Sequence, residues 1–225
     1  MFTGIVREIG RVVSVERSTD LVRLDIDCPT IRPDIGVGDS IATDGCDLTA
    51  TLLTPSGFRC DATKETLKRT ILGALKVGSS VNLEPSLTPS TPISGHFVLG
   101  HIDGVGEVRS FKRTGNQAEI VIAPPRALMR FIAEKGSIAV SGVGLTVVDV
   151  SEGSFSCWLI PYTLENTTLG SMRPGARVNI EVDVLARYVV RALSCGVHML
   201  EDSHVDATAR KEGITEEFLR EHGFG

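Results

Sequence analysis

The sequence lacks an excess of positive charge and any long apolar run. It has 225 residues, with 23 Lys and Arg against 28 Asp and Glu, which gives a formal net charge of −5 at pH 7. Because nucleic-acid binding depends on cationic contacts to phosphate, an acidic chain without a Lys/Arg cluster is a poor candidate for it. The apolar runs are far shorter than the roughly 20 residues that cross a bilayer, so we expect no membrane association.

Targeting signals and paired cysteines are also lacking. The first residues, MFTGIVRE, contain neither a long apolar stretch nor a small-residue cleavage site. The cysteines are odd in number and form no CxxC pair: Cys28, Cys46, Cys60, Cys157 and Cys195. In a chain of this size they predict reduced thiols in a reducing compartment, without a disulfide framework or a metal site. We therefore expect a cytoplasmic protein that binds no metal.

An internal repeat is the most informative feature of the sequence. When the chain is shifted by 97 positions, residues 40–84 align with residues 137–181, and 17 of the 45 aligned positions are identical. Unrelated sequences would share roughly three by composition, so chance does not explain the match. Two homologous domains are predicted, residues 1–90 and 91–186, with a linker rich in Pro, Ser and Thr near residues 85–92. Residues related by the repeat are called repeat twins below.

Each repeat consists of short segments that favour β-structure. Residues 12–15, 21–26, 40–42 and 81–84 are β-branched and partly alternating, with Gly or Pro between them. One or two helical turns that end in Gly are expected at residues 64–73 and 163–170. This pattern predicts an all-β protein with a small barrel or sandwich per repeat. We favour a closed barrel of six strands, because closure removes the exposed edges of an open sheet.

The C-terminal part of the chain has a different pattern. Residues 182–193 place Val182, Leu185, Val189 and Leu193 on one face at helical spacing, which predicts a helix that begins near residue 182. An apolar face on a helix that follows two complete barrels needs a partner, and a neighbouring subunit is the simplest one. Residues 187–225 are therefore predicted to form a C-terminal helix and a tail, with a short helix capped by Thr215.

Several short segments, taken in their order and spacing, resemble the riboflavin synthase family of the α-chain type. In the first half these are residues 1–6 (MFTGIV), 38–49 and 64–67 (KETL). In the second half they are residues 95–104 (GHFVLGHIDG), 135–139 (KGSIA), 159–170 and 178–181 (VNIE). The resemblance covers roughly residues 1–193.

This resemblance implies a fold, a reaction and an assembly. The fold is a pair of six-stranded antiparallel Greek-key β-barrels with a C-terminal helix that helps to form a homotrimer. Each barrel would bind 6,7-dimethyl-8-ribityllumazine, and the first barrel of one subunit would face the second barrel of its neighbour. Two lumazines would then exchange a four-carbon unit, giving riboflavin and a ribitylamino-pyrimidinedione, with no metal or added cofactor.

The resemblance also implies a set of ligand-binding residues in each repeat. The first barrel would use Gly4, Ile5, Val6, Asp47, Leu48, Thr49, Asp61, Ala62, Thr63, Lys64, Glu65 and Thr66. The second barrel would use His101, Ile102, Asp103, Gly144, Leu145, Thr146, Leu159, Ile160, Pro161, Tyr162, Thr163 and Leu164, with Lys135 reaching toward the neighbouring site. Phe2, Ser40 and His101 match positions near the reaction centre. We expect His96 to be structural.

Two segments depart from the family's pattern at positions that normally take part in catalysis. In the second half the family typically has Asp-Gly-x-Ser-Leu-Thr, whereas residues 141–146 are SGVGLT, so Ser141 replaces the acid and Gly144 the hydroxyl. In the first half the family typically has Asn-Gly-x-Cys-Leu-Thr, whereas residues 44–49 are DGCDLT. Asp47 therefore replaces the thiol, and Cys46 lies one residue earlier, on the opposite side of a regular strand.

The departures leave three interpretations open. In the first, turnover is retained with a relocated acid: Asp44 is the repeat twin of Ser141, and Asp44 or Asp47 would be catalytic together with Phe2, Ser40 and His101. In the second, the pocket binds lumazine or flavin without converting it. In the third, a related heterocycle undergoes different chemistry. A flavin-dependent reductase is disfavoured, because no glycine-rich nicotinamide motif is visible.

The side of the strand on which Asp47 lies bears on its role. A charged side chain that faces a barrel lumen costs free energy unless it is paired or hydrogen-bonded. An inward Asp47 would therefore indicate a ligand contact, and an outward Asp47 a solvated charge.

Overall fold

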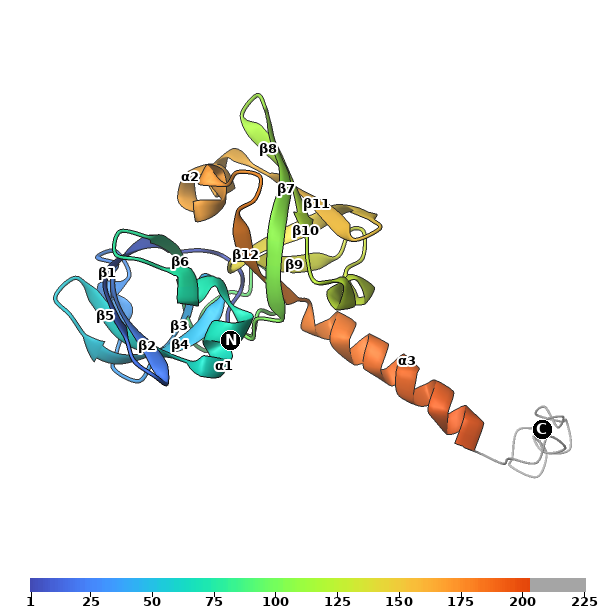
Figure 1. Cartoon of the computed structure of the whole chain (residues 1–225), viewed down its shortest axis with the longest axis horizontal. Helices are drawn as coiled ribbons and strands as arrows, with labels where there is room; N and C mark the ends of the chain where they lie inside the picture. The colour runs from blue at the N-terminus through green and yellow to red at the C-terminus, as the bar shows by residue number, and fades with distance from the viewer. Residues whose placement is uncertain (203–225) are drawn as a thin grey trace, which may run out of the picture. The chain divides into compact units, whose positions relative to one another are not determined.

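The computed structural model describes residues 1–202, which form two closed six-stranded barrels and a C-terminal helix (Figure 1). The strands of the first barrel are β1 (Glu8–Arg17), β2 (Leu21–Asp27), β3 (Ser40–Thr43), β4 (Cys46–Leu53), β5 (Gly57–Thr63) and β6 (Ser80–Pro85). Their order around the barrel is β1-β2-β5-β4-β3-β6, and every neighbouring pair is antiparallel. Because β2 pairs with β5 and β3 with β6, the connections are those of a Greek key.

The second barrel repeats this arrangement strand for strand. Its strands are β7 (Gly104–Thr114), β8 (Gln117–Ala123), β9 (Ser137–Val140), β10 (Val143–Ser151), β11 (Ser154–Leu159) and β12 (Arg177–Val182). Their cyclic order, β7-β8-β11-β10-β9-β12, matches that of the first barrel. The predicted class of two homologous antiparallel barrels is confirmed.

Short helices connect the strands at the same places in both repeats. A helical turn follows the fifth strand of each barrel, as α1 (Lys64–Arg69) and α2 (Pro161–Asn166), and a 3₁₀ turn comes next, as η2 (Ile71–Ala74) and η4 (Thr168–Ser171). Two further 3₁₀ turns are η1 (Arg32–Asp34) and η3 (Arg126–Phe131). The helical turns expected at residues 64–73 and 163–170 are present.

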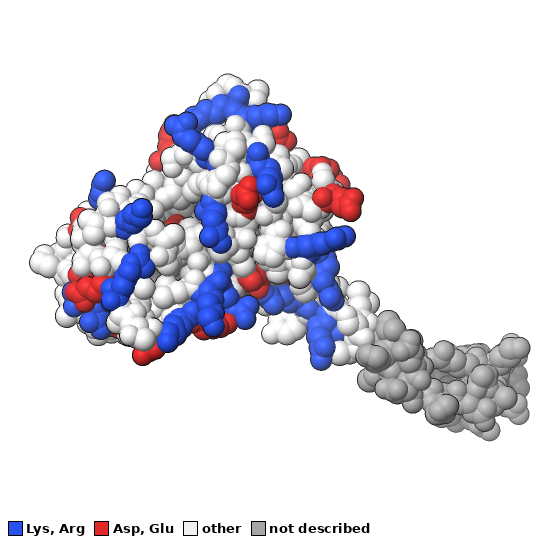
Figure 2. Space-filling model, viewed as in Figure 1, with Lys and Arg blue, Asp and Glu red and all other residues white. Residues whose placement is uncertain are grey.

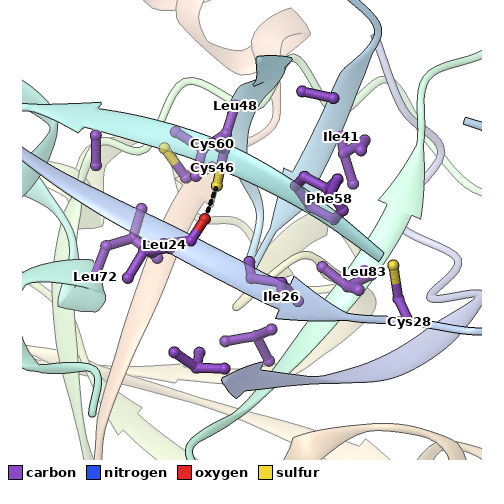
Figure 3. Close-up of a cluster of buried hydrophobic side chains, with 14 of the residues drawn as sticks. Leu24, Ile26, Cys28, Ile41, Cys46, Leu48, Phe58, Cys60, Leu72 and Leu83 are labelled. Carbon is purple, nitrogen blue, oxygen red and sulfur yellow. Dashed lines mark hydrogen bonds between the residues drawn. The ribbon is translucent and has the colours of Figure 1, made fainter. Parts of the chain in front are cut away.

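Alternation along the strands places the core inside each barrel. In β2, Val22, Leu24 and Ile26 are buried, and the residues between them face outward. Figure 3 shows Leu24 and Ile26 in one cluster with Phe58 of β5 and Leu83 of β6. Because each fully buried side chain of this size contributes about 1.5–3 kcal/mol, these alternating residues supply the main driving force for closing the barrel.

Four cysteines belong to these cores. Cys28, Cys46, Cys60 and Cys157 are buried, and the Cys60 thiol contacts the Leu24 carbonyl at 3.9 Å (Figure 3). Burial raises the pKa of the Cys46 and Cys157 thiols to about 12. These side chains are therefore protonated, weakly nucleophilic core residues at neutral pH.

The C-terminal helix α3 (Val184–Asp202) begins two residues later than predicted. Val182 lies in β12 with its side chain 2% exposed, so it belongs to the barrel core and not to the helix face. The other three predicted residues, Leu185, Val189 and Leu193, are all exposed, so no other part of residues 1–202 covers the apolar face. The tail predicted around Thr215 lies outside the described residues.

Charged side chains of both signs are interspersed on the surface. Figure 2 shows Lys and Arg distributed over the visible face, with Asp and Glu between them. Several form pairs across neighbouring strands, such as Arg59 with Asp25 at 2.6 Å and Arg23 with Asp61 at 2.9 Å. Within residues 1–202, no helix is long and apolar enough to cross a membrane. Among the side chains that the structure describes, residues 1–195, no group of His, Cys, Asp or Glu is arranged to hold a metal.

Candidate ligand-binding sites

The wall of each barrel is split at one place. The β4–β5 ladder runs from Leu53↔Phe58 to Ala50↔Cys60 and stops, so residues 47–49 pair only with β3 and residues 61–63 only with β2. In the second barrel the β10–β11 ladder stops in the same way at Val147↔Cys157. A β-bulge marks the last pairs of each ladder. Bulges bend a strand and end its pairing, which separates the two strands beyond them.

Backbone groups face the split from one strand of each barrel. Asp44 and Gly45 have positive φ values of 45° and 81°, as in a two-residue hairpin turn. In such a hairpin the backbone groups of alternate residues point away from the partner strand. Asp47 and Thr49 are the alternate residues here, and the Asp47 N–H donates to the Gly100 carbonyl at 3.0 Å. The N–H and C=O of Thr49, and of its twin Thr146, therefore point into the splits.

The side chains at the two splits differ in polarity. The rim of the first split is charged and paired: Asp61 binds Arg23, Lys64 binds Asp20 at 2.6 Å, and Glu65 binds Arg69 at 2.6 Å. At the rim of the second split the twins of Asp61, Thr63 and Glu65 are Trp158, Ile160 and Tyr162, which are 40%, 55% and 63% exposed. The first rim is therefore suited to polar contacts and the second to stacking on a ring.

The remaining predicted ligand residues of the splits divide into core and surface groups. Leu48, Ala62, Leu145 and Leu159 are buried, so their side chains complete the barrel cores beneath the splits. Thr63 accepts a hydrogen bond from the Thr66 backbone and begins α1. Pro161, Thr163 and Leu164 lie in α2, partly buried.

Each barrel core is completed by a residue from the loop before the other barrel. The Val6 side chain belongs to the core of the second barrel, and the Ile102 side chain belongs to the core of the first. We expected Gly4, Ile5 and Val6 in the first barrel and the 101–103 loop in the second, and this assignment is wrong for the side chains of Val6 and Ile102. The two loops are exchanged between the barrels.

Glycines allow the two loops to cross. The Gly4 carbonyl accepts a hydrogen bond from the Gly144 N–H at 2.7 Å, which is the twin of the bond from Asp47 to Gly100. Gly100 has φ +82°, and a Cβ atom there would lie 2.5 Å from the Asp47 Cβ and 3.0 Å from the Phe2 ring. Any larger residue would therefore force the crossing apart. Phe2 is fully buried at this point.

Two buried carboxylates hold the loops in place. Glu84 accepts hydrogen bonds from the Thr3 N–H at 2.7 Å, the Thr3 hydroxyl at 2.6 Å and the Gly4 N–H at 3.0 Å. Its twin Glu181 accepts from the backbone N–H groups of Leu99 and Gly100 at 2.6 and 3.0 Å. Burial raises the pKa of both carboxyls, and these donors oppose the rise. We did not predict this role, although both glutamates are identical in the repeat.

Asp44 lies at the contact between the barrels and not among the outward residues of a split. Its Oδ1 accepts the Asn82 N–H at 2.9 Å, just as the Ser141 hydroxyl accepts the Asn179 N–H at 3.2 Å. Each asparagine also donates its side-chain amide across the contact, from Asn82 to the Ser141 carbonyl and from Asn179 to the Asp44 carbonyl, both at 2.9 Å. Burial raises the pKa of Asp44 to about 7.

A cavity of about 350 Å³ opens at this barrel contact. Asp44 and Ser141 both line it, with Ile71, Thr168 and Met172. A carboxyl at position 44 or at position 141 would therefore face the same cavity. None of the outward residues of the two splits lines this cavity.

Asp47 and its twin Gly144 lie at the two loop crossings. The Asp47 side chain points outward, but it is only partly exposed because it lies beside Gly100 at the loop crossing. It is therefore not the solvated surface charge that we expected of an outward Asp47. Cys46 points into the core. A Cβ atom on Gly144 would lie 3.2 Å from the His96 Nδ1. Burial lowers the pKa of His96, and the nearby Asp183 opposes this. The crossing at Gly100 thus has a carboxylate, from Asp47, and the crossing at Gly144 has an imidazole, from His96. We did not predict the position of His96, because it lies in a loop without a periodic pattern.

The other candidate residues occupy more varied surroundings. Ser40 pairs with Thr49 across β3 and β4, on the outward face near the first split. His101 is exposed. Lys135 is exposed with φ +64°, at the position where its twin is Gly38 with φ +93°. An L-residue in this conformation is strained, which often marks a functional position.

Comparison with known proteins gives the family. The model of the lumazine binding domain matches residues 3–86 and again residues 99–183. Riboflavin synthase of Actinobacillus pleuropneumoniae is 37% identical over 224 residues, which cover 100% of both chains. The chain belongs to the riboflavin synthase family. The family's enzyme from Mycobacterium bovis is 44% identical over 197 residues, 86% of this chain and 98% of the relative.

Solved structures give the same fold for this member of the riboflavin synthase family. LumP complexed with riboflavin has a TM-score of 0.77 at 24% identity, over 81% of this chain and 99% of that chain. LumP complexed with 6,7-dimethyl-8-(1'-D-ribityl) lumazine has a TM-score of 0.74 at 23% identity, over the same shares. The departures from the family pattern fall at two places, the barrel contact (residues 44 and 141) and the loop crossings (residues 47 and 144).

Proposed function

We propose that the chain is a riboflavin synthase, which converts two molecules of 6,7-dimethyl-8-ribityllumazine into riboflavin and a ribitylamino-pyrimidinedione. The observation that carries this proposal is the duplicated split, with the backbone of Thr49 directed into one opening and that of Thr146 into the other. A dismutation consumes two copies of one heterocycle, and two related openings supply one binding site for each. Similarity to curated riboflavin synthases over the full chain supports the same reaction.

The reaction requires orientation and proton transfer, and needs no metal or added cofactor in this proposal. A four-carbon unit leaves one ring and joins the other, which requires loss of a proton from a ring methyl group and addition of a nucleophile to the donor ring. Fixing two bulky rings face to face contributes about 7–11 kcal/mol to such a bimolecular step. A positioned acid or base contributes a further factor of about 10²–10⁴.

Asp47 is the group that we assign to proton transfer at the first site. Its carboxylate lies on the outward face of β4, two residues from Thr49 and next to the buried Phe2 ring. No hydrogen bond or ion pair within the described residues occupies it, so it is free to act on a ligand. Ser40 borders the same opening, and His96 occupies the corresponding place at the second crossing. We assign the exposed His101 to the same reaction centre as part of this proposal.

The functional assembly in this proposal is a homotrimer in the cytoplasm. The domains are residues 1–90 and 91–186, and the segment from residue 187 supplies the trimer contact. The exposed apolar face of α3, formed by Leu185, Val189 and Leu193, supports a second copy of the chain as its partner. Lys135 would reach from one subunit toward the site of the next, so that the first barrel of one chain faces the second barrel of its neighbour.

Mixing the purified protein with 6,7-dimethyl-8-ribityllumazine tests the function directly. Absorbance follows riboflavin formation, and ligand fluorescence follows binding in parallel. We expect both binding and turnover, with turnover lost in Asp47→Asn. Binding without product would make the chain a lumazine or flavin carrier, and neither binding nor product would refute the ligand class.

A further inference from the structure

The carboxylate of Asp103 is not available to a ligand. Its side chain is only 8% exposed, and Oδ2 accepts the backbone N–H of Val182 at 2.9 Å. The guanidinium of Arg187 occupies the other oxygen, Oδ1. The Asp103 backbone N–H also donates to the Ile180 carbonyl at 2.9 Å. Asp103 is therefore fixed to the last strand of the second barrel and to the first turn of α3.

Arg187 is held from a second direction. Its guanidinium lies over the ring of Phe131, 5.9 Å from the centroid, at the end of η3. A cation over an aromatic face is attracted by the electron density of the ring. The guanidinium is thus fixed between the Gly100–Asp103 loop and η3, and this restricts where the loop can lie.

The residue beside this ion pair completes the first barrel. Ile102 is 9% exposed and belongs to the same core cluster as Leu48 and Ala62, which lie directly beneath the first split. Its Cδ1 would lie 3.4 Å from a Cβ on Gly45. Displacement of Asp103 by a fraction of an ångström would therefore move a side chain that packs under the first opening.

Among the described residues, the second barrel has no such connection. Val6, the repeat twin of Ile102, completes the core of the second barrel. The following residue, Arg7, is exposed, and within the described part of the chain its one anchor is its backbone N–H, which donates to the Leu83 carbonyl at 2.8 Å. The loop anchors Glu84 and Glu181 are common to both repeats, so the ion pair is an addition to one loop alone.

We infer that Asp103 and Arg187 are positioning residues for the ligand site of the first barrel, which they connect to the base of α3. The inference rests on the proposed function, since it concerns the affinity of one of its two sites. It predicts that the two sites of one chain respond differently to the loss of this ion pair, although their backbone frames are repeats of each other.

Trp158 allows the two sites to be told apart. It is the single tryptophan and lies at the rim of the second split. Ligand fluorescence follows the titration of the full chain with riboflavin, and the binding step that Trp158→Ala weakens is assigned to the second site. In Arg187→Gln we expect the affinity of the other step, the first site, to fall about tenfold, with the second-site affinity unchanged within twofold.

Two further variants make the test specific. Asp103→Asn keeps an acceptor for the Val182 N–H and removes the charge, so it should match Arg187→Gln, and the double variant should add nothing to either. Arg191→Gln is the matched control, because Arg191 is exposed on the next turn of α3 and forms no ion pair within the described residues.

The outcomes separate this inference from the proposed function. Equal weakening of both sites, an equal effect of Arg191→Gln, or additive effects of Asp103→Asn and Arg187→Gln would overturn the inference. Two normal binding steps in Arg187→Gln would overturn it as well, with the proposed function intact. Absence of riboflavin binding by the unaltered protein would refute the proposed function itself.

Discussion

The two barrels share a backbone and differ in their chemistry. Strand order, bulges, hairpin turns and the exchanged loops occur in both. Side chains differ at the loop crossings, the barrel contact and the rims of the splits, with Asp47 against Gly144, Asp44 against Ser141, and Asp61 against Trp158. The two repeats have therefore kept the same backbone structure, while their titratable and aromatic side chains at these places have become different.

The buried polar residues that are identical in the two repeats mainly stabilise the shared backbone structure and do not line the splits. Asn82 and Asn179 cross the barrel contact, and Glu84 and Glu181 hold the loops. A carboxyl or amide that satisfies buried backbone groups is costly to change, because an unpaired buried group loses about 1–3 kcal/mol. An outward residue at a split has no such constraint, so its chemistry can change without loss of the fold.

The largest effect is expected from Asp47→Asn. If the first crossing carries the proton-transfer group, riboflavin formation should fall about 10²–10⁴-fold, with ligand binding within a few-fold of the unaltered protein. Absorbance kinetics and fluorescence titration measure the two quantities. Asp149→Asn, an exposed acid on β10 of the second barrel, is the matched control. Full activity in Asp47→Asn would show that Asp47 is not the proton-transfer group, and that the two barrels do not differ in reactivity at this position.

Asn82→Ala and Asn179→Ala test whether the frame is symmetric. Each change removes one bond across the barrel contact and one to a 3₁₀ turn, from the Thr168 N–H to Asn82 and from the Ile71 N–H to Asn179, both at 2.8 Å. Leaving these buried groups unpaired should cost about 3 kcal/mol in either variant. Urea unfolding measures the loss. A difference above about 1 kcal/mol between the variants would contradict a symmetric frame.

Asp44→Asn tests the effect of the buried carboxyl that the hairpin turn of the first barrel has and the corresponding turn of the second barrel, at Ser141, lacks. Because burial raises the folded-state pKa to about 7 from 3.8, the folded protein retains a proton that the unfolded chain releases. The resulting cost in stability is absent below about pH 4, grows as the pH rises to about 7, and is constant above. Asparagine preserves the acceptor for the Asn82 N–H, so the variant should gain up to about 4 kcal/mol at pH 8.

Unfolding of the Asp44→Asn variant is measured at pH 4 and pH 8. At pH 4 the two proteins should be equally stable. Ser141→Asp in the Asp44→Asn background transfers the carboxyl to the other turn of the same cavity and should restore the pH dependence. A gain in stability that is equal at both pH values would point to a cause other than the buried charge.

The smallest effect is expected from Lys135→Gly. Lys135 occupies the left-handed region where its twin is Gly38, so glycine should relieve about 1 kcal/mol of backbone strain. If the lysine reaches a neighbouring site, activity should fall while the melting temperature rises. Gly38→Lys is the reciprocal control and should destabilise by a similar amount. Higher stability with full activity would remove Lys135 from the site.

The sequence predicted the parts of the fold that depend on local pattern. Alternation in β2 places Val22, Leu24 and Ile26 inside, and the same rule places Cys46 inward and Asp47 outward. The start of α3 was predicted two residues early because Val182 is apolar and fits a strand core as well as a helix face. Hydrophobicity alone does not separate the two at such a boundary.

The sequence could not predict which barrel receives a loop. Val6 and Ile102 are apolar residues before a strand, and nothing local indicates that each enters the other repeat's core. For the same reason the sequence did not indicate that Asp103 pairs with Arg187, which lies 84 residues further along the chain (187 − 103). Likewise, the turn motif around Asp44 does not reveal that two such turns meet at the barrel contact.

The exchanged loops carry a consequence for the origin of the molecule. A single repeat on its own would have a cavity in its core where the other repeat's side chain packs. It would also expose the apolar side chain, Val6 or Ile102, on the loop before its own first strand. Two copies of such a repeat would each supply what the other lacks, as Val6 and Ile102 do within one chain. Mutual completion of this kind favours an ancestor that acted as a pair, which gene fusion later made permanent and free to become unequal.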